Sequence, residues 1–326
     1  MSTESKILVT GGAGFIGSHL CQRLLADGHE VAVIDDFSTG SMDNIAQFKE
    51  DKKFQFVEGT VCDKQIMDGL IKNCDAVYHL AAAVGVNLIV ERPVHTIKTN
   101  IHGTEVVLEA ANKFNRKVLL TSTSEVYGKN ESVPFSEEDD SVLGSTKHSR
   151  WSYACSKAID EFLALAYHHQ YNLPVVVVRL FNTIGPRQTG QYGMVVPRFV
   201  ELALKNEPLL IYGTGRQSRC FSYVGDVVEA MVRLMASNEN DGELFNIGSD
   251  DEITIEKLAD KIIKKTNSKS KKEFISYKNA YGVDFDDMMR RVPSLKKIKE
   301  AVRFEPQTSQ DEALDIIIAD IRARLV

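Results

Sequence analysis

The sequence TGGAGFIG at Thr10–Gly17 lies between a strand-like run, Lys6–Thr10 (KILVT), and a helical pattern over Phe15–Asp27. Glycines at such a junction permit a tight turn and a close approach of the backbone to a pyrophosphate. The N-terminus of the helix adds free N–H groups and the positive end of its dipole. We therefore expect a dinucleotide-binding loop, the alternative being a plain strand–helix turn. The residues expected to hold the cofactor here are Gly11, Gly14, Phe15, Ile16 and Gly17.

An acidic residue ends the next strand-like segment. Asp35 closes Val31–Asp35 (VAVID) and lies 18 residues after Gly17. A carboxylate at this place accepts hydrogen bonds from the adenosine ribose hydroxyls and repels a 2′-phosphate. The glycine pattern and Asp35 together predict NAD rather than NADP as the cofactor.

Short strands alternate with helices through the first 180 residues. The predicted strands are Lys6–Thr10, Val31–Asp35, Phe54–Glu58, Ala76–Leu80, Val118–Ser122 and Pro174–Leu180, and the predicted helices include Phe15–Asp27, Asp63–Asn73, Gly103–Asn115 and Ala154–Tyr171. This alternation predicts an α/β fold, a Rossmann-type doubly wound parallel sheet. We expect an NAD-binding domain over 1–180 and a smaller C-terminal α/β substrate-binding domain over 181–326. The segment 223–248 is expected to return to the main sheet, and 253–326 to hold mixed helices and one short strand.

Composition and charge exclude several classes of protein. The 326 residues carry 39 Lys and Arg against 45 Asp and Glu, a net charge of −6, without the basic face of a nucleic-acid-binding protein. The five cysteines are scattered without a CxxC pair, which argues against a zinc site or a disulfide framework, and no metal site is expected. The N-terminus is polar, and no apolar run reaches the roughly 20 residues of a membrane span. These features predict a soluble, cytoplasmic protein.

Tyr153 and Lys157 are four residues apart near the start of a long helix, so they share one face. A tyrosine with a pKa near 10 is a poor base at neutral pH, whereas a nearby ammonium favours its phenolate. Lys157 is also placed to hold the nicotinamide ribose. Upstream, Thr121–Glu125 (TSTSE) follows a strand at the edge where open α/β sheets bind ligands. The alternative interpretation is that Tyr153 and Lys157 are ordinary residues on the exposed surface of the helix.

With these motifs the chain resembles the extended short-chain dehydrogenases/reductases, in the group of nucleotide-sugar epimerases, dehydratases and decarboxylases. The motifs are TGGAGFIG (Thr10–Gly17), HLAA (His79–Ala82), STSEVYG (Ser122–Gly128), YACSK (Tyr153–Lys157), FNTIGPR (Phe181–Arg187) and RCFSYVGD (Arg219–Asp226). The resemblance implies that NAD oxidises C4 of a UDP-sugar and later returns the hydride. It also implies a homodimer in which the helices Gly103–Asn115 and Ala154–Tyr171 of both subunits form a four-helix bundle. Further contacts expected on this basis are Asp63 and Ala81 for the cofactor, and Arg150, Asn182, Arg187, Tyr212 and Arg219 for the nucleotide sugar.

The reaction type depends on a few positions. Ser124 stands where 4,6-dehydratases typically have Asp, and Glu125 stands where many 4-epimerases have a small or apolar residue. The trio Thr123, Ser124 and Glu125 is similar to the UDP-glucuronate decarboxylases, as are Arg150 and an Arg-x-Pro segment starting at Arg291. The expected catalytic residues are Thr123, Ser124, Glu125, Tyr153, Lys157 and Arg291.

This resemblance favours UDP-glucuronate decarboxylation to UDP-xylose. Oxidation at C4 creates a ketone β to the C6 carboxylate, so loss of CO₂ leaves an enolate that Thr123 and the Tyr153 hydroxyl are placed to stabilise. Arg291 would supply a proton at C5 through a water. Glu125 would either disfavour the charged ground state or orient that water, and both roles stay open. The alternatives are a UDP-sugar 4-epimerase, a nucleotide-sugar dehydratase and a non-catalytic NAD-sensing protein.

Overall fold

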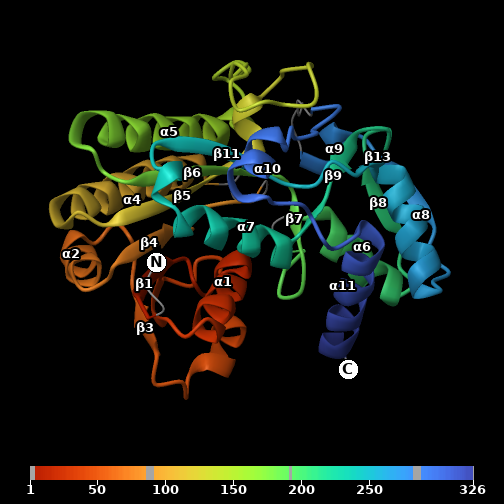
Figure 1. Cartoon of the computed structure of the whole chain (residues 1–326). Coiled ribbons are helices and arrows are strands. Elements are labelled where there is room, and N and C mark those ends of the chain that lie inside the picture. Colours follow the sequence, from red (N-terminus) through yellow and green to blue (C-terminus); the bar gives the residue numbers. More distant parts are fainter. Residues whose placement is uncertain (1–3, 86–91, 191–192, 282–287, 326) are drawn as a thin grey trace.

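A seven-stranded, all-parallel sheet is the centre of this computed structural model, which describes residues 4–85, 92–190, 193–281 and 288–325 (Figure 1). The strand order is β11-β6-β5-β4-β1-β2-β3. Its strands are β1 (Lys6–Thr10), β2 (Glu30–Asp35), β3 (Phe54–Glu58), β4 (Ala76–His79), β5 (Lys117–Thr123), β6 (Val175–Leu180) and β11 (Glu243–Ile247). The predicted doubly wound α/β fold is confirmed.

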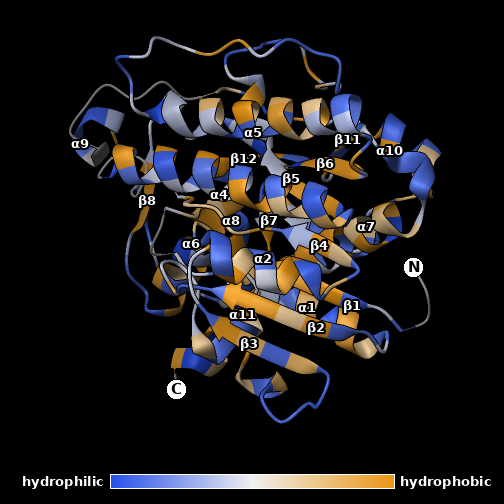
Figure 2. Ribbon diagram, turned by 90° about the vertical axis from the view of Figure 1, so that its left-hand side faces the viewer, coloured by the Kyte–Doolittle hydropathy of each residue, from blue (hydrophilic) through white to orange (hydrophobic). Residues whose placement is uncertain are grey.

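Helices cover both faces of this sheet. On one face lie α1 (Phe15–Ala26), α7 (Val224–Ala236) and α10 (Lys296–Val302), and on the other α2 (Lys64–Lys72), α4 (Pro93–Phe114) and α5 (Arg150–Tyr171). The central strands are buried between the two layers, and Figure 2 shows β1 and β2 as largely hydrophobic ribbons. Burial on both sides explains why these strands are continuous aliphatic runs.

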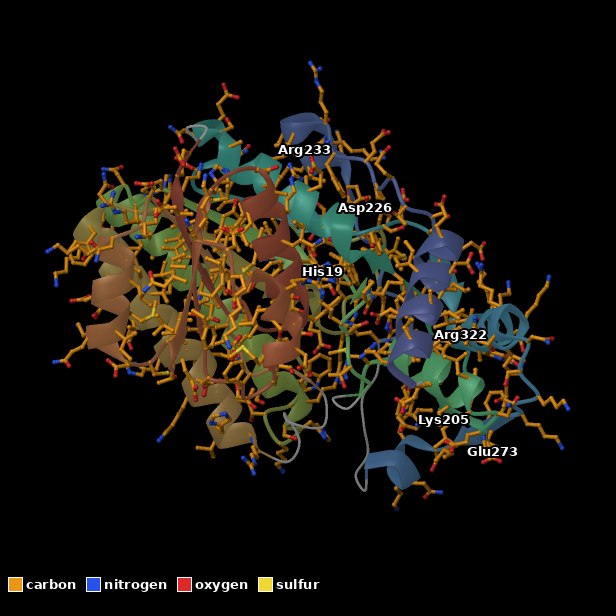
Figure 3. All side chains as sticks on the ribbon, turned by 90° about the horizontal axis from the view of Figure 1, so that it is seen from below. His19, Lys205, Asp226, Arg233, Glu273 and Arg322 are labelled. Atoms are coloured by element: carbon orange, nitrogen blue, oxygen red, sulfur yellow. The ribbon has the colours of Figure 1, made fainter. Side chains whose placement is uncertain are left out.

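The C-terminal part has its own hydrophobic core and three small two-stranded sheets. These pair β7 (Thr183–Ile184) with β10 (Ser222–Tyr223), β8 (Leu209–Tyr212) with β13 (Lys272–Ile275), and β9 (Ser218–Cys220) with β12 (Glu252–Thr254). Its helices are α6 (Val195–Leu204), α8 (Ile255–Thr266), α9 (Tyr277–Tyr281) and α11 (Gln310–Leu325). Charged side chains such as Lys205, Glu273 and Arg322 lie on the outside of this part (Figure 3).

The chain crosses between the two parts more than once. After β10, α7 packs against the main sheet, and β11 pairs in parallel with β6 at the edge of that sheet. Asp226, at the start of α7, accepts a hydrogen bond from the Thr308 N–H at 3.0 Å, and so ties α7 to the segment before α11 (Figure 3).

Several elements differ from the sequence-based expectation, and α5, for example, begins at Arg150 instead of Ala154. Helix α4 begins at Pro93, ten residues before Gly103, and the proline occupies its first turn, where the missing N–H costs no hydrogen bond. The C-terminal region contains the two short strands β12 and β13 instead of one. No helix in the described ranges has both the length and the hydrophobicity that crossing a bilayer requires.

Candidate active site

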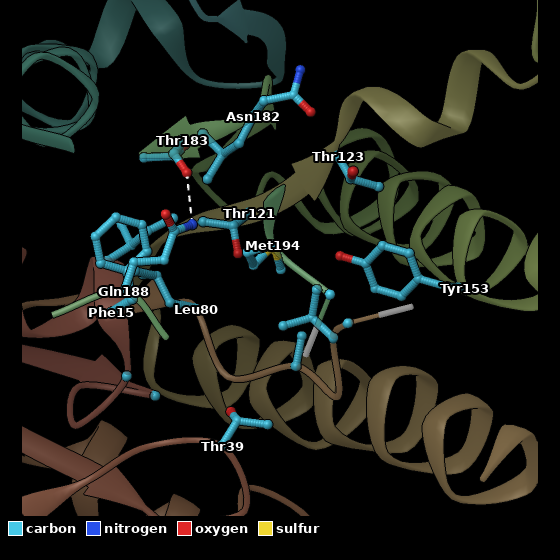
Figure 4. Close-up of a pocket in the computed structure, with 18 of the residues that line it drawn as sticks. Phe15, Thr39, Leu80, Thr121, Thr123, Tyr153, Asn182, Thr183, Gln188 and Met194 are labelled. Carbon is cyan, nitrogen blue, oxygen red and sulfur yellow. Dashed lines mark hydrogen bonds between the residues drawn. The ribbon is translucent and has the colours of Figure 1, made fainter. Parts of the chain in front are cut away.

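A cavity of about 470 Å³ lies between the carboxyl ends of the main-sheet strands and the C-terminal part (Figure 4). It is lined by residues from the glycine-rich turn, from the ends of β2, β4 and β5, from α5, and from several loops of the C-terminal part. The predicted site residues that line it are Gly11, Gly14, Phe15, Ile16, Gly17, Asp35, Ala81, Thr123, Ser124, Glu125, Arg150, Tyr153, Lys157, Asn182, Tyr212, Arg219 and Arg291.

The glycine-rich turn has the shape of a phosphate cradle. Gly11 has φ +71°, and a Cβ there would lie 2.8 Å from the Ala81 nitrogen. A Cβ on Gly17 would collide with the Gly11 carbonyl oxygen. Gly14 is the N-cap of α1, with no side-chain cap and no acidic residue in the first turn. The free N–H groups of α1 therefore meet the cavity, which fits a bound pyrophosphate.

Asp35 lies beside this turn at the end of β2 and is 8% exposed. Its two carboxylate oxygens accept hydrogen bonds from the Ala13 N–H at 3.0 Å and the Phe37 N–H at 2.9 Å. Burial raises its pKa, and these backbone hydrogen bonds oppose that rise. The carboxylate is thus held rigidly where a ribose would meet it, which fits an adenosine without a 2′-phosphate.

Tyr153 and Lys157 both project from the first turns of α5 and are buried. The Lys157 ammonium pairs with the Asp160 carboxylate at 2.8 Å, and both side chains are almost fully enclosed. Burial raises the pKa of Tyr153, Glu125 and Asp160 raise it further, and a hydrogen bond with Thr123 and the charge of Arg291 lower it. In the protein without cofactor the pKa of Tyr153 is therefore raised overall, with burial as the largest cause.

Next to Tyr153, the 3-10 helix η3 (Ser124–Tyr127) carries a buried charge cluster. An Arg291 guanidinium nitrogen lies 3.5 Å from a Glu125 carboxylate oxygen, and another lies 3.5 Å from the Ser124 hydroxyl. Thr123 caps η3 by accepting a hydrogen bond from the Glu125 N–H at 3.2 Å. Ser124 and Arg291 are 1% and 6% exposed. Residues 167 positions apart in the sequence thus form one polar group in the lining of the cavity.

Other residues of the cavity lining combine aromatic and cationic groups. The Arg198 guanidinium lies 4.3 Å from the centre of the Tyr212 ring and donates to the Leu210 carbonyl at 3.1 Å. Arg219, 8% exposed, donates to two backbone carbonyls, of Ser218 at 2.7 Å and of Met288 at 2.8 Å. A flat ring and two guanidinium groups suit a nucleobase and a diphosphate.

Two predicted residues do not line the cavity. The Arg187 guanidinium donates to the Ser18 hydroxyl at 3.3 Å and to Gln22 Oε1 at 2.6 Å, so it contacts α1. Asp63 caps α2 by accepting the Gln65 N–H at 2.9 Å. Asp63 is placed by the cap of its own helix, whereas Arg187 is placed by tertiary contacts with α1 that its motif does not reveal.

The structure adds three residues that sequence reasoning missed. Asp160 has a weak signal in the sequence, since it lies three residues after Lys157 on the same helix face. Arg198 and Gln188 line the cavity from segments whose path depends on tertiary packing, and no spacing points to them.

Comparisons with known proteins place the chain among nucleotide-sugar enzymes. Residues 8–317 match the family model described as GDP-mannose 4,6 dehydratase. UDP-N-acetyl-alpha-D-glucosaminuronate decarboxylase of Bacillus cytotoxicus is 42% identical over 314 residues, covering 95% of this chain and 96% of that protein. UDP-glucuronic acid decarboxylase 4 of Arabidopsis thaliana is 36% identical over 322 residues, covering 98% of this chain and 69% of that protein.

Solved structures agree in fold over nearly the whole chain. UDP-glucuronic acid 4-epimerase from Bacillus cereus, in complex with UDP-glucuronic acid and NAD, has a TM-score of 0.88 at 30% identity, covering 98% of this chain and 99% of that one. Pal from Bacillus thuringiensis has a TM-score of 0.89 at 33% identity, with the same coverage.

Proposed function

The chain belongs to the extended short-chain dehydrogenase/reductase family of nucleotide-sugar epimerases, dehydratases and decarboxylases, and we propose that it decarboxylates a UDP-hexuronate, UDP-glucuronate first of all, yielding UDP-xylose. NAD is the proposed cofactor. The glycine cradle and the buried Asp35 support it, as do similar structures solved with NAD. The residues proposed to hold it include Gly11, Gly14 and Asp35, with Ala81 beside the turn.

One observation carries the proposal, namely the cluster of Ser124, Glu125 and Arg291 next to Tyr153. A neutral sugar offers a buried guanidinium only hydroxyl oxygens, whereas the C6 carboxylate of a hexuronate forms the stronger, charge-assisted hydrogen bonds. Ser124 in place of an aspartate leaves this cluster without the acid that a dehydratase uses to expel a hydroxyl. The cluster therefore favours a substrate with a carboxylate at C6.

Oxidation at C4 comes first in the proposed mechanism. Tyr153 takes the proton of the C4 hydroxyl, with Thr123 hydrogen-bonded to the phenol. Bound NAD supplies the chemistry of accepting the C4 hydride and returning it at the end. Lys157 would hold the cofactor ribose, and Asp160 positions it by pairing with its ammonium group.

Loss of CO₂ follows from the new ketone. The C5–C6 bond breaks, its electron pair forms the C4–C5 double bond of an enolate, and CO₂ departs. Thr123 and the protonated Tyr153 stabilise the charge on O4 by hydrogen bonds. Arg291 binds the carboxylate beforehand, but it shares its charge with Glu125, so it holds the leaving group less firmly than an unshared cation would. A proton then adds to C5 from a water on Arg291.

A second candidate substrate is UDP-N-acetylglucosaminuronate. The relative named for this activity matches the chain at 42% identity across almost the full length of both proteins. The reaction at C4, C5 and C6 is the same, because the two substrates differ only at C2. The choice between them depends on the wall of the cavity around C2.

The decisive experiment offers both UDP-hexuronates to the purified protein and follows CO₂ release and products by NMR. We expect CO₂ and UDP-xylose from UDP-glucuronate, with little net NADH. Glu125→Ser should slow CO₂ release more than it weakens substrate binding, and a 4-keto sugar should accumulate together with NADH. Glu131→Ser, which changes an exposed glutamate, is the matched control.

Other outcomes would refute the proposal. Formation of UDP-galacturonate without CO₂ would identify an epimerase and remove the role given to Glu125. Loss of water from a neutral UDP-sugar, with UDP-glucuronate inert, would identify a dehydratase. CO₂ release from UDP-N-acetylglucosaminuronate alone would select the second candidate.

We also propose a homodimer formed by α4 and α5. Their outer faces expose apolar side chains, with Val94 66%, Ile159 44% and Phe162 72% exposed. Burying such a stripe against the same helices of a second subunit would remove it from water. Phe162→Glu should yield a monomer in analytical ultracentrifugation, whereas an unchanged sedimentation coefficient would contradict the proposed interface.

A further inference from the structure

A fully buried asparagine, Asn246, joins three separate segments of the chain behind the cavity. It lies near the end of β11, the strand at the edge of the main sheet beside β6 (Figure 1). Its Nδ2 lies 3.0 Å from the Phe135 carbonyl oxygen and 3.5 Å from the Ser294 carbonyl oxygen. Its Oδ1 lies 2.7 Å from the Tyr127 hydroxyl. One side chain thus holds three distant segments together.

The orientation of the Asn246 amide follows from these neighbours. The carbonyl oxygens of Phe135 and Ser294 can only accept, so the NH₂ group must face them. Oδ1 then accepts the hydrogen of the Tyr127 hydroxyl. The donors and the acceptor of the amide all have partners, and a buried polar group satisfied in this way favours one arrangement of its surroundings.

Two of the contacted residues are close in sequence to the charge cluster of the cavity. Tyr127 ends η3 two residues after Glu125, and Ser294 follows Arg291 by three residues. The Glu125 carboxylate and the Arg291 guanidinium are 3.5 Å apart, which is already long for a hydrogen bond. Even a small separation of the two segments would therefore part them. The Asn246 amide contacts both segments and opposes that separation.

The third contacted residue, Phe135, bridges the other two. Its N–H donates to the Val292 carbonyl at 2.8 Å, and its carbonyl accepts from the Ser294 N–H at 2.7 Å. Its ring stacks on the Tyr127 ring with the centroids 4.7 Å apart. Both rings are fully buried. The segment 292–294 is thus held against η3 through Phe135 as well as through Asn246.

We infer that Asn246 is a positioning residue for recognition of the C6 carboxylate. Its amide holds residues 291–294 against η3, so the Arg291 guanidinium is in place before the substrate binds. Asn246 is buried outside the cavity lining, so it acts through Arg291 and does not touch the sugar. A cation ordered in advance spares the complex the cost of ordering it on binding. This inference rests on the proposed function, since it requires a substrate with a carboxylate at C6.

The test compares UDP-glucuronate with UDP-glucose, which differs only at C6, by titration calorimetry in excess NAD. All proteins carry Tyr153→Phe, which prevents turnover during the titration. With Tyr153→Phe alone, UDP-glucuronate should bind roughly tenfold more tightly, the worth of a charge-assisted hydrogen bond. Adding Asn246→Leu should weaken UDP-glucuronate binding by roughly three- to tenfold and leave UDP-glucose binding within about twofold.

The matched control is Asn240→Leu. Asn240 is also buried, and its amide donates to the Leu234 carbonyl at 2.9 Å, but it lies in η4 (Asn238–Asn240), outside the cavity lining. This variant should lose stability in urea titrations and keep the preference for UDP-glucuronate.

A double-mutant cycle supplies a second readout. In protein that also carries Arg291→Met, Asn246→Leu should change neither affinity, because the guanidinium through which Asn246 acts is absent. If Asn246→Leu does not fold, Tyr127→Phe carries the test. It removes only the hydroxyl that donates to Asn246, keeps the ring on Phe135, and should reduce the preference in the same direction.

The failures are distinguishable. Equal affinities for the two ligands in protein with Tyr153→Phe alone would overturn the proposed substrate class. A preference that is present there and survives in Asn246→Leu and Tyr127→Phe would overturn the role of Asn246 and leave the proposed function standing. Equal weakening of both ligands, or an effect of Asn246→Leu that persists beside Arg291→Met, would show a merely structural residue and overturn that role as well.

Discussion

Replacing either member of the Glu125–Arg291 pair should move the pH dependence of C4 oxidation, and the two replacements should move it in opposite directions. Glu125 raises the pKa of Tyr153 and Arg291 lowers it. The reactive form is the phenolate. Glu125→Gln should therefore shift the acid limb of the profile to lower pH, and Arg291→Met should shift it to higher pH.

The size of the shifts follows from the closeness of the pair. The two charges lie 3.5 Å apart and their side chains are only 17% and 8% exposed, so their fields at Tyr153 partly cancel. At an effective dielectric constant of about 20 such charges interact by about 5 kcal/mol, so each is strongly held by the other. Removing one leaves the other uncompensated. Glu125 and Arg291 are among the main influences on the pKa of Tyr153, and a nearby charge moves a pKa by roughly one to three units, so we expect limbs displaced by about one unit.

The assay is kcat/KM for UDP-glucuronate against pH, supported by the ultraviolet difference spectrum of tyrosinate with Tyr153→Phe as the background. The measured quantity is the pH at which kcat/KM falls on the acid side. The maximal kcat/KM is not compared, because Arg291→Met would also remove the proposed contact with the substrate carboxylate. Limbs that move in the same direction in both variants, or that stay within a few tenths of a pH unit, would refute the electrostatic reasoning.

Three further predictions concern other parts of the site and its support. Tyr153→Phe should lower turnover by roughly 10²- to 10⁴-fold while calorimetry still shows binding of nucleotide sugar, and activity within a few-fold of normal would assign the base to another residue. Asp35→Ala should weaken NAD binding and relax discrimination against NADP, and equal affinities for NAD and NADP in the unmodified protein would contradict the role of Asp35. Glu161→Gln breaks a buried ion pair with Arg179 at 2.8 Å and should destabilise the fold by about 3–5 kcal/mol in urea titrations, whereas a loss below about 1 kcal/mol would show that the pair is dispensable.

The fold was predictable because its information is local. The turn at Thr10–Gly17 and the strand Val31–Asp35 are short segments whose residue types satisfy their own backbone conformations. A parallel strand buried on both faces is aliphatic wherever it lies in the chain. The start of α4 at Pro93 could not be predicted in this way, because the first turns of the helix carry polar residues without a clear helical spacing of apolar ones.

The site was predictable where it depends on spacing within one element and not where it depends on tertiary contact. Tyr153 and Lys157 share a helix face by their spacing alone. Arg187 resembles a ligand in its motif, yet Ser18 and Gln22 bind its guanidinium across the interface with α1. The place of Gln188 in the cavity lining likewise depends on the folded turn, in which its amide nitrogen donates to a backbone carbonyl.

The return of β11 to the edge of the main sheet restricts how this protein can be divided or recombined. Ending the chain after Leu180 would expose β6, whose Val175–Val178 are fully buried and apolar, as an edge open to pairing with other chains. Such a fragment should aggregate on expression. Exchange of the C-terminal part between relatives by gene fusion would likewise require three junctions instead of one, with residues 224–247 staying behind to complete the sheet.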